Sequence, residues 1–337
     1  MPSKIKLIYI LGTGFSGSTL LSLVLGTQKG VLNLGEVWAL ENDYVENRKC
    51  SCGKNVMNCN YWQWIINSYQ KFVSDYDQDQ IFDFIHGQKD SDFVFNGLTL
   101  RQRVLHHLTL DSYLLFGRKN VHHYRYKNYI FFKFILNLFK NKYEYVVDSS
   151  KSVDRLMILN TSKLFDIFVI FLTRDGMSIV GKQINNSSSL FLRNLGIKTF
   201  EKTIRWELLI RRCLKCLEKL NGKKCYRTTY EKFSTKTEHI VSEICMLLDI
   251  DYNPNSLDRN SNEYFSRSKQ HIFTGNSLIE KLNCIDEIKY IERWKSMLTS
   301  KDRIIFKICG GEKLKKKSRI PDRRNKIMSK GKKSLLL

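Results

Sequence analysis

Proline, glycine and long apolar runs are all scarce in this chain of 337 residues. It holds only 3 Pro and 18 Gly and shows no repeat at a fixed period, which argues against a collagen-like chain, a β-sandwich and a linker-rich array. The longest apolar stretches, Ile130–Phe139 and Ile167–Leu172, fall short of the roughly 18 residues that a membrane helix needs. We therefore expect a globular protein without a transmembrane segment.

The beginning of the chain does not have the pattern of a signal peptide. Lys4 and Lys6 precede an apolar stretch, but this stretch runs into a Gly/Ser/Thr turn and not into a small-residue cleavage site. The pattern favours a buried strand and a cytoplasmic protein. Its 9 Cys are then expected to be mostly reduced, and an odd number does not suggest a complete disulfide framework.

Acidic residues are also few, with 33 Asp and Glu against 56 Lys and Arg, so the formal net charge is +23. Eleven of the basic residues lie between Lys313 and Lys333 with a single acid, Asp322. We expect residues 313–337 to form a flexible tail, either simply solvated or a weak patch for anionic lipid or nucleic acid. Residues 1–312 remain basic without it, which suits an anionic ligand.

Short apolar runs alternate with amphipathic stretches along residues 1–312. Strands are expected at Lys6–Leu11, Tyr143–Val147, Ile167–Thr173 and Lys224–Thr229. Helices are expected at Ser16–Leu25, Leu156–Leu164, from about Gly176, at Thr199–Leu220, Ile240–Leu248 and Ile285–Leu298, and residues 61–142 look mostly helical and aromatic. This alternation predicts a single α/β domain with a parallel sheet covered by helices on both faces.

The most informative stretch is Gly12-Thr13-Gly14-Phe15-Ser16-Gly17-Ser18-Thr19. It follows a predicted strand and opens a predicted helix, which is the context that a phosphate-binding loop requires. Glycines let the backbone approach an anion, and the free amides and dipole of the helix start attract it. The alternative is a Gly/Ser-rich turn without a ligand.

The loop departs from the nucleoside-triphosphatase pattern G-x-x-x-x-G-K-[ST] at one position. Gly12, Gly17 and Thr19 fit the pattern, but Ser18 stands where the lysine that reaches the β- and γ-phosphates is expected. The difference argues against an ATPase or kinase and favours a less charged, phosphate-like group.

The same loop resembles the 5′-phosphosulfate loop of sulfotransferases that use 3′-phosphoadenosine 5′-phosphosulfate (PAPS), although Phe15 stands where many members carry Lys or Arg. Further stretches resemble that family in the expected order over residues 5–310: Val31 to Glu36, Cys50 to Gly53 with Cys59 and Trp62, Val147 to Lys151, Phe171 to Gly176, Tyr230-Glu231, and His271 to Asn276. The resemblance implies an α/β fold of the P-loop NTPase-like kind, with a central parallel sheet in three layers, and PAPS as sulfuryl donor with no metal required.

The resemblance also implies roles for single residues at the donor site. The donor-binding candidates in the first loop are Gly14, Phe15, Ser16, Gly17, Ser18 and Thr19. Arg174, at a predicted strand end, is expected to bind the 3′-phosphate in preference to a salt bridge with Asp175. Lys182 stands where the family usually has a second phosphate-binding Ser, and Ser178, one helical turn earlier, can share that role. Further donor candidates are Tyr230, which is equally compatible with the core, His271, Gly275 and Asn276.

Glu36 is the candidate general base, because the turn at Gly35 should bring it to the carboxyl end of the sheet, where ligands bind in open α/β folds. The alternative is that Glu36 is a surface residue at a helix start. His106 and His107 are rival candidates for the base, but their apolar helical stretch favours a structural role for them. Lys151 is the second catalytic candidate. It either supplies the positive charge missing at Phe15, contacts the acceptor, or is simply solvated.

Three cysteines, Cys50, Cys52 and Cys59, lie close together in the sequence. A structural zinc ion needs four ligands, usually at C-x₂₋₄-C spacing, whereas here the first gap is one residue and no fourth ligand is obvious. The spacing therefore favours a packed thiol cluster or a redox-dependent disulfide, and no metal site is predicted.

Together these observations predict a PAPS-dependent sulfotransferase acting on a hydroxyl acceptor, a carbohydrate or small metabolite, with residues 61–142 as a possible acceptor lid. One alternative is a P-loop nucleotide-binding, kinase-like enzyme. The other is a non-catalytic basic protein that binds anionic surfaces, although no motif for specific nucleic-acid binding is present.

Overall fold

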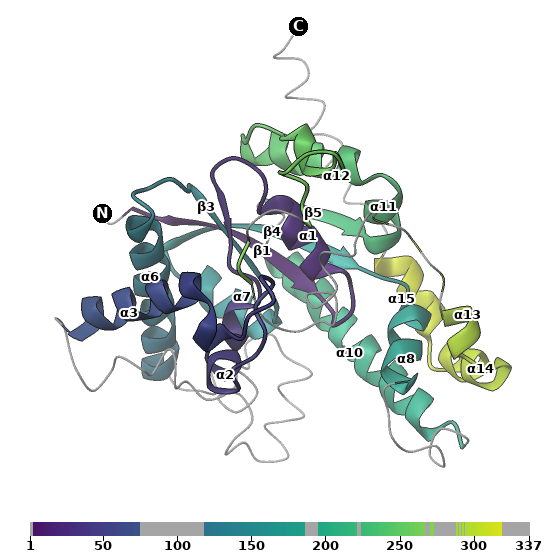
Figure 1. The fold of residues 1–337 in the computed structure, drawn as a ribbon. Helices are drawn as coiled ribbons and strands as arrows, with labels where there is room; N and C mark the ends of the chain where they lie inside the picture. The colour runs from purple at the N-terminus through teal and green to yellow at the C-terminus, as the bar shows by residue number, and fades with distance from the viewer. Residues whose placement is uncertain are drawn as a thin grey trace, which may run out of the picture.

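The computed structural model describes residues 3–74, 118–185, 195–220, 224–266, 270–272, 288, 290, 292 and 294–318. Its centre is a five-stranded sheet in the order β2-β3-β1-β4-β5 (Figure 1). The strands are β1 (Ile5–Gly12), β2 (Val31–Asn33), β3 (Tyr145–Lys151), β4 (Phe165–Thr173) and β5 (Cys225–Thr229). All paired strands are parallel, so the predicted parallel α/β architecture is confirmed.

Helices connect and cover the strands. The helices before β4 are α1 (Ser18–Leu25), η1 (Val37–Ala39), α2 (Leu40–Val45), η2 (Val56–Asn58), α3 (Asn60–Ser74), α6 (Arg118–Leu138) and α7 (Val153–Asn160). Those after β4 are α8 (Gly176–Asn185), α10 (Ile197–Lys219), α11 (Tyr230–Thr235), α12 (Thr237–Leu248), η5 (Pro254–Ser256), α13 (Trp294–Met297), α14 (Ser300–Ile308) and α15 (Gly311–Ser318). None of the helices within these described ranges is long and apolar enough to cross a membrane.

Two apolar cores enclose the sheet, one on each face. Leu7, Tyr9 and Leu11 of β1 belong to the core shared with α6, α7 and α10, whereas Ile8 and Ile10 belong to the core shared with α1 and α12. Figure 1 shows α11 and α12 on one side of the sheet and α7 and α10 on the other. Because β1 is buried on both faces, its sequence is a nearly continuous apolar run, as in other parallel sheets.

Several predicted elements differ from the observed ones. The strand predicted to end at Val147 continues as β3 to Lys151, and β2 was not predicted. The predicted helix Ile285–Leu298 is confirmed only near its end, where α13 spans Trp294–Met297, whereas Ile288, Tyr290 and Glu292 are not helical. A capping box at Thr299 begins a new helix, α14, and thereby separates it from α13.

The boundary drawn between the domain and the basic tail falls inside a helix. Helix α15 spans Gly311–Ser318, and its Leu314 is buried. The tail prediction beyond Ser318 lies outside the described residues.

Candidate active site

The carboxyl ends of β1, β3 and β4 meet at one edge of the sheet. Leu11 of β1 is in register with Lys151 of β3, and Gly12 is in register with Leu172 of β4. The chain leaves β1 between these two neighbours, one from each side of the strand order, and this is the crevice where ligands bind in open α/β sheets. The β1–α1 loop, residues 13–17, therefore lies where a ligand site is expected.

Two residues of the loop have backbone conformations in the left-handed region. Phe15 has φ 63° and Gly17 has φ 93°, and a non-glycine residue in the left-handed region is uncommon outside strained or functional sites. Helix α1 begins at Ser18, and its N-cap, Gly17, contributes no side-chain hydrogen bond. The amides of the first helical turn have no partner within the helix, so they are open to an anion.

Several polar atoms around the loop are buried without a hydrogen-bond partner. They are the hydroxyl oxygens of Thr13, Ser16 and Ser178 and the Nε of Arg174. Buried polar groups are nearly always satisfied in native proteins, so this concentration at one loop marks a place for a polar ligand. Three hydroxyls, one guanidinium nitrogen and open amides are mostly donors, which fits the phosphate and sulfate oxygens that the resemblance implies.

Arg174 turns toward the loop from the end of β4. Its Nη1 donates to the carbonyl oxygen of Phe15 at 3.2 Å, and its guanidinium carbon lies 4.3 Å from the centroid of the Tyr230 ring. The Asp175 carboxylate accepts the amide of Met177 at 3.0 Å at the start of α8. The structure thus places Arg174 and Tyr230 beside the loop.

Tyr230 also packs against Gly17. A Cβ atom on Gly17 would lie 2.3 Å from the Tyr230 ring, so no larger residue fits there without a shift. Of the two predicted positions for Tyr230, an adenine contact or the core, the structure supports the core: the ring is partly buried against the core shared with α1 and α12, and it also lies against Gly17 and Arg174.

Helix α8 brings a cation to the position where the loop lacks one. The Nζ of Lys182 lies 4.6 Å from the centroid of the Phe15 ring, in the range of a cation–π contact. Ser178, one turn earlier on α8, is buried. Lys182 therefore places its charge against Phe15 of the loop.

The two predicted catalytic residues, Glu36 and Lys151, form an ion pair between Glu36 Oε1 and Lys151 Nζ. Gly35, at φ 69°, accepts the amide of Ser149 at 2.8 Å, which brings Glu36 to the end of β3. The Trp38 indole nitrogen donates to Glu36 Oε2 at 3.2 Å. Glu36 is only 8% exposed, so the surface-Glu alternative is wrong.

The end of β3 is braced from within the protein. Asp148 accepts Arg155 Nε at 2.8 Å, and both side chains are almost completely buried. The same carboxylate accepts the Ser150 amide at 2.9 Å. Lys151 then leaves the strand at φ 65°, and its Nζ donates to the Ser149 carbonyl at 3.1 Å. These contacts fix the direction from which Lys151 reaches Glu36.

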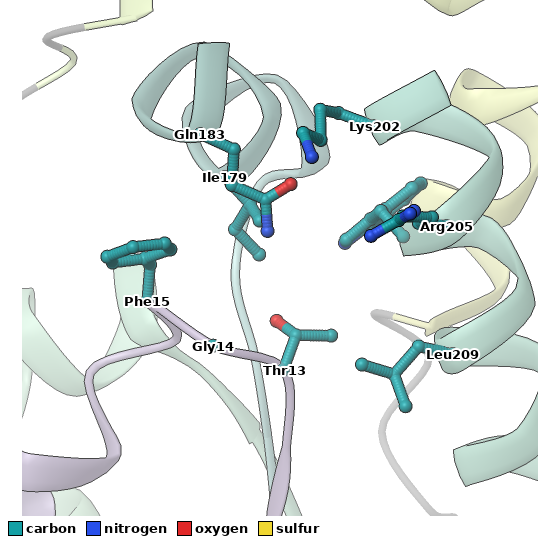
Figure 2. A pocket seen from close by; sticks show the side chains of 9 residues that line it. Thr13, Gly14, Phe15, Ile179, Gln183, Lys202, Arg205 and Leu209 are labelled. Atoms are coloured by element: carbon teal, nitrogen blue, oxygen red, sulfur yellow. The ribbon is translucent and has the colours of Figure 1, made fainter. Parts of the chain in front are cut away.

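A cavity of about 340 Å³ opens beside the loop, within the size range of small-molecule sites. Its lining comes from the loop, α8 and α10: Thr13, Gly14, Phe15, Ile179, Gln183, Lys202, Arg205, Trp206 and Leu209. Figure 2 shows Lys202 and Arg205 on the α10 side, across the cavity from Phe15. Sequence analysis missed both cations, although their spacing of three residues on a predicted helix places them on one face.

The structure places His271 in a different cluster from the one expected. Its Nδ1 lies 3.3 Å from Cys59 Sγ and 3.7 Å from Cys50 Sγ, and its ring stacks on Tyr61 with a centroid separation of 4.4 Å. Burial lowers the pKa of His271 and raises the pKa of the Cys59 thiol. The expectation that the cysteines have no fourth partner is wrong. The remaining candidates, Gly275, Asn276, His106 and His107, lie outside the described residues.

Comparison with known proteins gives matches of structure only. No protein-family model matches the chain, and no curated protein matches it in sequence. It is similar to the sulfotransferase domain from the curacin biosynthetic pathway (16% identity, 91% of this chain and 99% of that chain, TM-score 0.46). It is also similar to the sulfotransferase domain of the olefin synthase of Synechococcus PCC 7002 (14%, 91% and 95%, TM-score 0.46) and to sulfotransferase STF9 of Mycobacterium avium (15%, 88% and 76%, TM-score 0.44). This is a likeness of fold between chains of very different sequence.

Proposed function

We propose that this protein is a sulfotransferase that moves a sulfuryl group from PAPS to a hydroxyl acceptor. The observation that carries the proposal is the set of unpartnered polar atoms at the β1–α1 loop. The buried hydroxyls of Thr13 and Ser16 belong to the loop before the open start of α1. Arg174 Nε and the Ser178 hydroxyl come from the end of β4 and from α8, both of which contact Phe15 of the loop. Such a set matches a ligand whose oxygens accept hydrogen bonds from several directions.

The residues of the loop favour a phosphosulfate over a triphosphate. The side chain at position 18 is a serine hydroxyl, so the lysine that spans the β- and γ-phosphates is absent from the loop. Positive charge comes instead from Arg174 and Lys182, on β4's carboxyl end and on α8. A guanidinium is suited to a terminal phosphate, so we assign Arg174 to the 3′-phosphate.

Glu36 and Lys151 are assigned to the chemistry. The acceptor oxygen forms the new bond to sulfur, the bond from sulfur to the phosphate oxygen breaks, and the hydroxyl proton goes to the Glu36 carboxylate. Both oxygens of that carboxylate are already oriented, one by Lys151 and one by the Trp38 indole. Lys151 lies in register with the end of β1, and there its charge stabilises negative charge that develops during transfer.

The cavity beside the loop favours an acceptor with flat apolar faces and several polar groups. Phe15 and Trp206 offer ring surfaces, while Gln183, Lys202 and Arg205 offer hydrogen-bond donors. A carbohydrate or a small hydroxylated metabolite fits this combination. The acceptor-lid role of residues 61–142 stays a prediction, because residues 75–117 lie outside the described part.

The decisive experiment measures the binding of 3′,5′-adenosine bisphosphate, adenosine 5′-monophosphate and ATP with Mg²⁺ by titration calorimetry. We expect the bisphosphate to bind most tightly, and labelled sulfate to pass from PAPS to members of a hydroxyl-acceptor panel. Tightest binding of ATP with Mg²⁺ would establish the kinase-like alternative. Binding of anionic vesicles that falls steeply with salt and disappears without residues 313–337, with no nucleotide effect, would establish the basic binder.

A further inference from the structure

Three cysteines and one histidine bring their ligand atoms to one point, away from the chemistry assigned to the loop. The Sγ atoms of Cys50, Cys52 and Cys59 and one nitrogen of His271 all lie within 4.8 Å of one another. Cys50 and Cys59 are each 1% exposed, whereas Cys52 is exposed to solvent. The cluster is therefore closed toward the protein and open at a single corner, which gives an ion a path of entry.

The distances between the ligand atoms are close to the edges of a small tetrahedron. Cys52 Sγ lies 3.7 Å from Cys59 Sγ, and Cys59 Sγ lies 3.8 Å from Cys50 Sγ. The His271 Nδ1 lies 3.3 Å from Cys59 Sγ and 3.7 Å from Cys50 Sγ. Zinc bonds of about 2.3 Å to sulfur and about 2.05 Å to nitrogen in a tetrahedron predict edges of about 3.8 Å and about 3.6 Å. Four of the six distances between ligand atoms therefore match a tetrahedral S₃N site, and the other two are no longer than 4.8 Å.

Backbone groups act on all three sulfurs in the direction that favours the thiolate. The backbone groups of Cys52, Lys54 and Trp62 lower the pKa of the Cys50, Cys52 and Cys59 thiols, respectively, against the effect of burial. Such contacts stabilise negative charge on sulfur and orient the ligands around a metal. The turn that carries the first two of these groups depends on Gly53 at φ 86°, whose own amide donates to the Cys50 carbonyl at 2.9 Å.

A second group of contacts holds the histidine in place. The amide of Ser51 donates to the carbonyl of Ile272 at 2.8 Å, and the amide of Ile272 donates to Ser51 Oγ at 3.0 Å. The Trp62 indole donates to the His271 carbonyl at 2.8 Å, and Tyr61 stacks on the imidazole. The segment 270–272 is thus joined to the cysteine loop on both sides of the ligand.

We propose that Cys50, Cys52, Cys59 and His271 bind one Zn²⁺ ion in a closed, structural S₃N site. A divalent, thiophilic ion with tetrahedral preference is the class that this donor set selects. The ion joins residues 50–59 to residues 270–272 and so fixes Gln270. That side chain donates to the Leu23 carbonyl at 2.8 Å and accepts from Asn33 at 2.9 Å. The zinc site thereby connects to α1 and to β2, the elements that carry the loop and lead to Glu36.

The first test is the metal content of the full-length protein, purified under reducing conditions without chelator and measured by inductively coupled plasma mass spectrometry. We expect about one zinc ion per chain, and less than about a tenth of that in Cys52→Ser and His271→Ala. Cys309→Ser is the matched control, because Cys309 is a partly exposed cysteine outside the cluster, and it keeps full zinc content. Retention of zinc in both ligand variants would overturn the proposal.

The second test does not depend on the folding of a variant. Wild-type protein is stripped of metal under reducing conditions and titrated with Zn²⁺ against a chromogenic chelator, then with Co²⁺. We expect uptake of one equivalent and the strong visible absorption of tetrahedral, thiolate-bound cobalt. No uptake of either ion by reduced protein would overturn the proposal, as would a disulfide between two of the three cysteines in protein prepared with reductant.

Binding of 3′,5′-adenosine bisphosphate is measured in parallel on the zinc-loaded and stripped protein. Nucleotide binding without zinc uptake would contradict the proposed metal site alone. Zinc uptake without nucleotide binding would contradict the proposed function alone. A lower melting temperature of the stripped protein, restored by Zn²⁺, is the expected mark of a structural ion.

Discussion

The β1–α1 loop and the cysteine–histidine cluster are assembled in opposite ways. The loop, residues 13–17, and the ends of β1 and α1 beside it fall within eight consecutive residues, Gly12 to Thr19, so their glycines, their hydroxyls and the helix start can all be read from the sequence. The cluster draws three ligands from residues 50–59 and its fourth from His271, which is 212 positions beyond Cys59. A motif of consecutive residues can be recognised from the sequence alone. A site whose ligands are far apart in the sequence can be recognised only once the fold brings them together.

The loop nevertheless depends on distant residues as well. Its cation comes from Lys182 on α8, its carbonyl is held by Arg174 from β4, and Gly17 lies under the ring of Tyr230. Both regions therefore depend on residues that are distant in the sequence, and the cluster depends on them more than the loop does. Local sequence sets the backbone of the loop, and the tertiary fold supplies its charges.

The largest expected effect is at Glu36, where the proposed chemistry takes place. Glu36→Gln keeps the size of the side chain and removes its capacity to take a proton, so we expect kcat to fall by about 10²–10⁴-fold. The binding of 3′,5′-adenosine bisphosphate, measured by calorimetry, should change little. Glu46→Gln is the control, because Glu46 pairs with Arg48 on the exposed surface. Unchanged turnover in Glu36→Gln would reassign the base.

Arg174→Ala is expected to have the next largest effect, and on binding. Loss of a charged hydrogen bond worth about 1.5–3 kcal/mol should weaken the binding of 3′,5′-adenosine bisphosphate by roughly 10- to 150-fold. Adenosine 5′-monophosphate should lose less, because it has no 3′-phosphate. Arg211→Ala is the matched control, since Arg211 lies on the exposed side of α10 in an ion pair with Glu207. Equal loss for both nucleotides would remove Arg174 from the 3′-phosphate and leave it a support of the loop.

Periodicity was sufficient for most of the fold. The strands β1, β4 and β5 and the helices α1, α10 and α12 were predicted within a few residues, because each has a continuous apolar run or an apolar face that only one type of element can bury. The short strand β2 was missed, since its three residues are too few to show a period. The helix predicted at Ile285–Leu298 had enough apolar residues, but within its described part only Trp294–Met297 is helical, and the helix α14 that the capping box at Thr299 begins was not predicted.

The site was predictable in part for the same reason. The turn at Gly35 and the strand end before Arg174 predicted positions at the carboxyl edge of the sheet for Glu36 and Arg174, but no sequence rule indicated that Glu36 and Lys151 form an ion pair. The contact of Lys182 with Phe15 and the stacking of Tyr61 on His271 are also tertiary. Sequence spacing gives the edge on which side chains gather, and packing decides which of them touch.

A smaller effect is expected from Gly17→Ala, which tests the local part of the loop. The substitution adds a Cβ at φ 93° and 2.3 Å from the Tyr230 ring, and strain of about 1–3 kcal/mol should weaken bisphosphate binding by about fivefold or more. Gly30→Ala is the control for backbone strain alone, because Gly30 has φ 75° but no atom closer than 4.0 Å to the added Cβ. Similar affinity in the two variants would contradict the tight packing of the loop against Tyr230.

The smallest effect is expected when the cation beside the loop is moved from Lys182 on α8 to position 15 in the loop itself. Lys182→Ala removes the charge over Phe15, and a cation–π contact of about 0.5–1 kcal/mol predicts a loss of roughly two- to fivefold in kcat/KM. Phe15→Lys returns a cation to the loop itself and should restore the rate in the double variant. The positive φ of Phe15 disfavours both side chains to a similar degree, so strain does not confuse the comparison. If the double variant is slower than Lys182→Ala, the aromatic ring of Phe15 contributes to activity by itself. A cation at position 15 then does not replace the cation of Lys182.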